Sequence, residues 1–149
     1  MDVAATTRTP VHLWIVGIVS LLWNAFGAYD YLMTQMNNQW YLSDFMQLSE
    51  ADQAYVNGFP AWADAAWAFG VWGAVLGSLL LLIRSRLAYW AFVVSLVGLF
   101  VATLYQHLVS PWPADMMTSE NLALNLGIWA VALALLIYSY RMLVKGVLR

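Results

Sequence analysis

Four long apolar stretches alternate with short polar connections along the chain. The stretches cover residues 11–33, 61–83, 87–108 and 122–144, and each is 22 or 23 residues long. An α-helix rises 1.5 Å per residue, so about 20 residues cross a hydrocarbon core that is ~30 Å thick. The pattern therefore predicts four transmembrane helices in a single domain that covers residues 1–149.

The longest polar connection, residues 34–60, has features of short helices. Ser43 and Ser49 each precede a stretch that is typical of a helix start, and Asp52 completes a capping-box spacing with Ser49. Gly58 follows where the second short helix would end. We expect this connection to form a short helical lid between the first two spans.

The basic residues alternate strictly between connections. The two connections 34–60 and 109–121 contain no Lys or Arg. The six cations are Arg8 before the first span, Arg84 and Arg86 between the second and third, and Arg141, Lys145 and Arg149 at the end of the last. Cationic connections stay on the cytoplasmic side of a membrane. The sequence thus predicts an all-α polytopic four-helix bundle in a bacterial inner membrane, with both termini cytoplasmic and the lid outside.

Composition narrows the classes of protein that fit. The chain is 63% hydrophobic and only 9% charged, whereas soluble domains are about 25% charged. Its predicted partner is therefore the lipid bilayer. No basic patch remains for nucleic acid, because all six cations lie at the inner boundary. Cysteine is absent, which excludes disulfides and thiolate metal sites. We expect no cofactor.

Small residues recur at helical spacing within the spans. Lipid supplies little hydrophobic drive between helices, so small residues promote association by letting backbones approach closely. The glycines expected to pack against other helices are Gly70, Gly73 and Gly77 in the second span, Gly98 in the third and Gly127 in the fourth.

Polar residues inside apolar spans are costly and are therefore candidates for function. The solute or proton candidates are Asn24, Asp30, Asp64, Gln106, His107 and Asn125. All but Asn24 are predicted near the outer end of their spans. Three interpretations remain open: boundary residues that contact water and headgroups, a water-filled cavity for a small polar solute or protons, and a metal site. The metal candidates are Asp30, Asp64, His107 and Glu120.

No catalytic motif is present. The chain contains neither a nucleophile elbow nor a phosphate-binding loop. We therefore expect a non-enzymatic membrane protein that acts through helix association, as a homo-oligomer or as a small subunit of a larger membrane complex. The alternatives are a small-solute or proton-coupled transporter or sensor that uses the outer polar residues, and a metal-binding membrane protein.

Three segments carry a resemblance. LWNAFGAYDY at 22–31, GFPAW at 58–62 and WAFGVWG at 67–73 resemble a group of small proteobacterial inner-membrane proteins. Members of that group are generally uncharacterised or are loosely labelled sugar-transporter-like. The resemblance implies a four-helix membrane protein and supplies no catalytic residues. The four-span layout is also similar to that of the DoxX-like superfamily.

Overall fold

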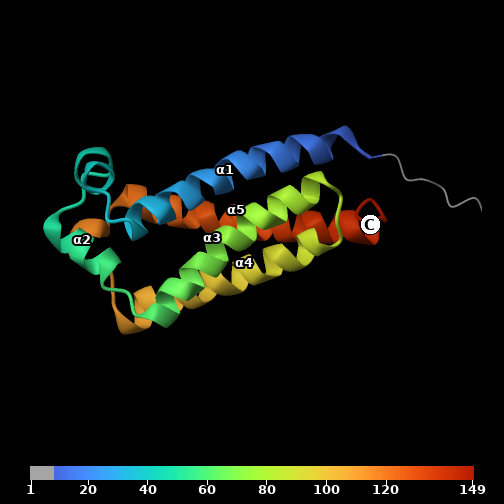
Figure 1. Ribbon diagram of the computed structural model, residues 1–149. Coiled ribbons are helices and arrows are strands. Elements are labelled where there is room, and N and C mark those ends of the chain that lie inside the picture. The colour runs from blue at the N-terminus through green and yellow to red at the C-terminus, as the bar shows by residue number, and fades with distance from the viewer. Residues whose placement is uncertain (1–8) are drawn as a thin grey trace, which may run out of the picture.

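The computed structural model describes residues 9–149, and in this part of the chain all regular structure is helical (Figure 1). The long helices are α1 (Val11–Gln35), α3 (Ala61–Leu82), α4 (Leu87–Leu104) and α5 (Ser119–Val144), and a π-helical turn, η2 (Tyr105–Val109), extends α4. Four helical segments are long and apolar enough to cross a membrane, with η2 counted as part of α4. Each begins and ends within three residues of a predicted stretch, and the all-α prediction is confirmed.

Local polar groups set the helix ends. Thr118 precedes α5, and its Oγ1 accepts a hydrogen bond from the Asn121 amide at 3.2 Å. This cap satisfies an otherwise free N–H and starts α5 three residues before the apolar pattern does. Pro10 and Pro60 precede α1 and α3 in extended conformation, so neither helix continues backwards from its first residue.

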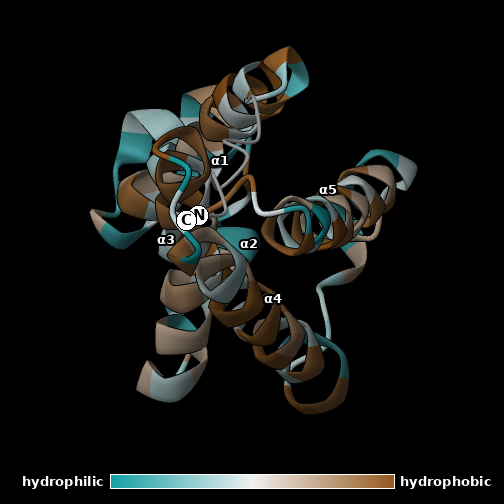
Figure 2. Ribbon diagram, turned by 90° about the vertical axis from the view of Figure 1, so that its right-hand side faces the viewer, coloured by the Kyte–Doolittle hydropathy of each residue, from teal (hydrophilic) through white to brown (hydrophobic). Residues whose placement is uncertain are grey.

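The long helices run alternately up and down between two different ends. One end, here called the basic end, holds the turn between α3 and α4, the end of α5 and all the described Lys and Arg residues (Figure 1). The other, called the lid end, holds residues 36–60. Arg8 lies outside the described residues. Helix α3 contacts α4 most extensively and α1 next, whereas α5 packs mainly on α4. Viewed from the end, α5 stands apart from α1 (Figure 2).

Glycine lets the backbones of α3 and α4 meet. A Cβ atom on Gly98 would lie 2.5 Å from both the Ala66 carbonyl oxygen and the Gly70 nitrogen. One on Gly73 would lie 3.0 Å from the Ser95 nitrogen. The Ser95 hydroxyl also donates a hydrogen bond of 2.5 Å to the Gly70 carbonyl. Helices that approach this closely gain dispersion energy from many backbone contacts, as the small-residue pattern predicts.

Two further predicted packing glycines behave differently from each other. The ring of Phe92 covers Gly77, where a Cβ atom would come within 2.7 Å of ring carbons. By contrast, apart from the backbone of its own helix and its chain neighbours, no described residue has an atom within 4 Å of the position that a Cβ atom on Gly127 would take. Helix α5 thus turns the side that carries Gly127 away from the rest of this chain, and the packing of Gly127 against another helix stays a prediction.

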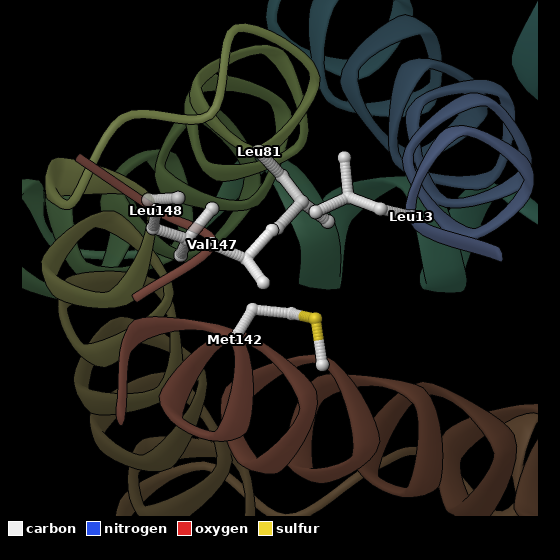
Figure 3. Packing of buried hydrophobic residues seen from close by; sticks show 6 residues of the cluster. Leu13, Leu81, Met142, Val147 and Leu148 are labelled. Atoms are coloured by element: carbon white, nitrogen blue, oxygen red, sulfur yellow. The ribbon is translucent and has the colours of Figure 1, made fainter. Parts of the chain in front are cut away.

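A hydrophobic cluster at the basic end joins all four long helices. Leu13, Leu81, Ala88 and Met142 come from α1, α3, α4 and α5, and Val147 and Leu148 fold back from the chain's end onto them (Figure 3). His12 Nδ1 lies 2.6 Å from the Tyr138 hydroxyl, which ties α1 to α5 at the same end. The basic end is therefore where α5 is held in place.

The lid contains one helix that was predicted and one that begins elsewhere. In α2 (Glu50–Asn57) the predicted capping box is present, because Ser49 Oγ accepts from the Asp52 amide and Asp52 accepts from the Ser49 amide. The other helix is a π-helical turn, η1 (Trp40–Phe45), so the predicted start at Ser43 is wrong. It begins earlier because Asn38 Oδ1 accepts the amide hydrogen of Tyr41, at 2.9 Å.

Candidate functional site

Asp30 is held by the lid. The Tyr41 hydroxyl donates a hydrogen bond of 2.8 Å to Asp30 Oδ1, and Tyr41 is 0% exposed. The Tyr29 ring meets the Tyr41 ring edge-on, with 5.4 Å between centroids. Burial, together with the adjacent Asp30 carboxylate, raises the pKa of Tyr41 above its ordinary value. Tyr41 therefore stays neutral and remains a hydrogen-bond donor, so this pair fastens η1 to α1.

Asp64 has a different partner. The Gln35 side-chain amide donates a hydrogen bond of 2.5 Å to Asp64 Oδ1, which links the last residue of α1 to the first turn of α3. The Tyr31 and Trp67 rings pack edge-on between the same two helices, with 5.0 Å between centroids. Asp64 is thus part of the contact between α1 and α3.

Asn24 lies near the middle of α1 and also joins α1 to α3. Its Nδ2 donates to Ser78 Oγ at 3.0 Å and to the Ala74 carbonyl at 3.3 Å. Ser78 is completely buried, and its hydroxyl donates to the Ala74 carbonyl at 3.0 Å. In apolar surroundings these polar groups satisfy one another's hydrogen bonds, so the cluster links α1 to α3.

The remaining polar candidates do not join these pairs. His107 is exposed and its Nδ1 lies 2.9 Å from the Thr103 carbonyl of the preceding turn. Gln106 and Asn125 are half-buried, and neither side chain forms a hydrogen bond with any other described residue. Three of the six candidates therefore belong to separate pairs and the other three join none of them, so the hydrogen bonds do not gather the six into one cluster.

The described residues do not gather the ligands of a metal site. Within residues 9–149, no group of three or more His, Asp or Glu side chains is placed so that it could hold a metal ion. Asp30 and Asp64 bind different partners, His107 turns back onto its own helix, and Glu120 lies exposed in the first turn of α5. The metal-binding alternative consequently finds no support in the described residues.

Two pockets are lined by other residues. An apolar groove of about 520 Å³ follows α3 and α4 on the side of Trp62, Phe69, Val94 and Val97. A smaller pocket of about 250 Å³ lies at the basic end and is lined by Ile83, Arg84 and Arg149. Neither pocket contains any of the six polar candidates, so these residues do not line a shared cavity of either kind.

Helix α5 presents a face that this chain leaves uncovered. Its buried residues, Leu135, Ser139 and Met142, all lie in the half near the basic end. At 100° per residue, the small residues Ala123, Gly127, Ala130 and Ala134 follow a stripe that is centred about 120° around the helix from these buried residues. The three alanines of this stripe are exposed and Gly127 has no close neighbour among the described residues. We call these four residues the α5 stripe.

Sequence reasoning missed the partners of the polar candidates. Tyr41, Gln35 and Ser78 each bind one of them, and no short motif marks these residues. Their only signal is that an aspartate or asparagine inside an apolar span needs a partner. Comparison with known proteins finds no matching family model, no matching curated protein and no matching solved structure. The candidate sites therefore depend on the chain's own geometry.

Proposed function

We propose that this chain is a non-enzymatic integral membrane protein that works as a homo-oligomer, and that a second copy packs on the α5 stripe. One observation carries the proposal: α5 is a 26-residue apolar helix that buries no residue in its half near the lid end. The helices α1, α3 and α4 bury residues along their whole length. The uncovered half of α5 is therefore the surface of this chain that is best suited to an added helix.

The chemistry of the stripe favours a second transmembrane helix. Small side chains let two backbones approach closely, as they do at Gly73 and Gly98 inside this chain. No charged side chain occurs in α5 between Glu120 and Arg141. Two copies related by a twofold axis would bring the same uncharged, small-residue surface together, so the contact is self-complementary.

The proposed location is a bacterial inner membrane, with the basic end in the cytoplasm. Five described cations lie at that end, whereas the lid carries Asp44, Glu50 and Asp52 and no cation. Cationic connections are retained on the side from which the chain is inserted. A cysteine placed in the lid and labelled from outside the cell by a membrane-impermeant reagent tests this orientation.

Cysteine cross-linking tests the association directly, because the chain contains no native cysteine. The test variant is Ala130→Cys on the α5 stripe. The matched control is Ile128→Cys, which is also exposed and lies about 160° around the helix from Ala130. Oxidation in native membranes should yield a disulfide-linked dimer for Ala130→Cys. Equal cross-linking of both variants would contradict the proposal, and a heavier product would identify a different subunit as the partner.

Two glycine variants distinguish an effect on association from an effect on folding. Gly127→Leu should abolish the Ala130→Cys dimer while leaving the monomer folded, because no described atom would meet the new side chain at its Cβ. Gly27→Leu is the control, since Gly27 in α1 has the same open surroundings. Circular dichroism in detergent should show the same helix content for both variants. Persistence of the dimer in Gly127→Leu would refute the role of the stripe.

Transport of a small solute or of protons has weaker support. Asp30, Asp64 and Asn24 already bind Tyr41, Gln35 and Ser78, and these contacts fasten helices together. We therefore expect Asp30→Asn and Asp64→Asn to change stability rather than flux. Loss of uptake by reconstituted vesicles at unchanged stability would favour the transport alternative.

A further inference from the structure

The chain's last residues are fastened to the turn between α3 and α4. The Arg149 amide donates a hydrogen bond of 2.7 Å to the Arg84 carbonyl, and the Arg86 amide donates one of 3.1 Å to the main-chain oxygen of Arg149. Arg84 has φ of 61°, a left-handed conformation that L side chains seldom adopt. These contacts fix the backbone of two arginines beside each other at the basic end.

The Arg84 guanidinium is oriented but incompletely bound. Its Nε donates to the Val147 carbonyl at 3.2 Å, while its Nη2 is buried and has no hydrogen-bond partner among the described residues. Buried N–H groups without a partner are rare, because each costs free energy of desolvation. The Nε–Nη2 edge of the guanidinium therefore faces the protein, which fixes the orientation of the side chain.

A pocket adjoins Arg84. It has a volume of about 250 Å³ and is lined by Ile83, Arg84 and Arg149. Within residues 9–149 neither arginine forms an ion pair with an acidic side chain. Ile83 is 73% exposed, so the pocket joins an apolar surface to two positive charges. Acidic side chains of the described residues therefore leave both charges open to an anion from outside the chain.

We propose that this pocket binds a phosphate group, supplied in the membrane by the headgroup of an anionic phospholipid. Phosphate oxygens accept strong, charge-assisted hydrogen bonds from guanidinium groups, and the two arginines that line the pocket offer two positive charges to one phosphate. Basic pockets between transmembrane helices at the cytoplasmic side recognise phospholipid headgroups in this way. The exposed Ile83 lies where the adjoining acyl chain would emerge. A bound phosphate would also bridge the α3–α4 turn and the chain's end, and this proposal does not depend on the α5 stripe.

The test compares two charge-removing variants at the basic end. Arg149→Gln removes a cation that lines the pocket, and its side chain makes no hydrogen bond in the described residues. Lys145→Gln removes one cation nearby but outside the pocket lining. Delipidated protein in a neutral detergent is titrated with phosphatidylglycerol, with zwitterionic phosphatidylcholine or with inorganic phosphate, and the rise in melting temperature gives an apparent Kd.

Phosphatidylglycerol should stabilise the native protein and Lys145→Gln with similar apparent Kd values, whereas Arg149→Gln should bind it about fivefold more weakly. Phosphatidylcholine should bind native protein and both variants alike. A matching Arg149-dependent response to inorganic phosphate would support the site and identify free phosphate as its ligand. Equal weakening in Arg149→Gln and Lys145→Gln, or equal responses to both lipids in the native protein, would overturn the proposal.

Discussion

The close contact between α3 and α4 makes a sharp prediction for Gly98→Ala. The added methyl group would lie 2.5 Å from the Ala66 carbonyl oxygen and from the Gly70 nitrogen. Both neighbours are backbone atoms, so no flexible side chain can move aside. The two helices must instead separate by about 0.5–1 Å, which forfeits a quarter to a half of the dispersion energy of their closest contacts.

The expected cost follows from two opposing effects. Overpacking a well-packed contact costs about 1–3 kcal/mol, and separating the helices also stretches the hydrogen bond from Ser95 Oγ to the Gly70 carbonyl, now 2.5 Å long. Replacing a helical glycine by alanine returns about 0.5–1 kcal/mol of conformational entropy. We expect Gly98→Ala to lower the free energy of unfolding by about 2 kcal/mol.

The matched control is Gly27→Ala in α1, where no atom beyond the local helix backbone and the chain neighbours lies within 4 Å of the added Cβ. This variant should gain about 0.5–1 kcal/mol, because only the entropic effect remains. Unfolding by sodium dodecyl sulfate in mixed micelles, followed by far-ultraviolet circular dichroism, gives both free energies. Equal stability of the Gly98 and Gly27 variants would refute the argument from backbone contact.

Two further predictions concern hydrogen bonds between segments. Asn24→Ala and Ser78→Ala should each destabilise the protein by about 0.6 kcal/mol. Because the two residues share one hydrogen bond of 3.0 Å, a double-mutant cycle in mixed micelles should show coupling between them. Additive losses would contradict this prediction. Burial, with a smaller effect of nearby Tyr105, raises the pKa of Tyr55 to about 12. The hydrogen bond from Tyr55 to the Ser110 carbonyl should therefore stabilise the lid fully below about pH 10, and this stabilisation should weaken as the pH rises towards 12. Hydrogen exchange in the lid should follow this trend, and Tyr55→Phe should remove it; an unchanged pH response in that variant would rule it out.

The sequence predicts the helices well, because their signals are local. Apolar length marks each span, and the Ser49 and Asp52 pair marks the start of α2 before any tertiary contact is considered. Small-residue spacing also identifies Gly73, Gly77 and Gly98 as contact points. These features depend on residues within a few turns of one another, so periodicity and capping chemistry are enough to find them.

The sequence does not predict which helix faces which, because the spans are apolar on every side. Gly73 and Gly127 occur in similar small-residue patterns, yet one touches a neighbouring backbone and the other touches nothing described. The partner of Asp30 is hidden for a related reason: Tyr41 reaches it only because a π-helical turn redirects the chain after α1. Such contacts depend on long-range geometry that no local pattern encodes.

The uneven anchoring of α5 gives the molecule a mechanical property. Met142 and Tyr138 fix the helix at one end, and its other end lies about 35 Å from Met142 along the helix axis. A tilt of about 5° there would shift the far tip by roughly 3 Å. The connection into that tip carries Ser110, which Tyr55 of the lid holds. A small tilt of α5 beside the arginines would therefore produce a larger displacement at the other end of the helix, where the lid is attached.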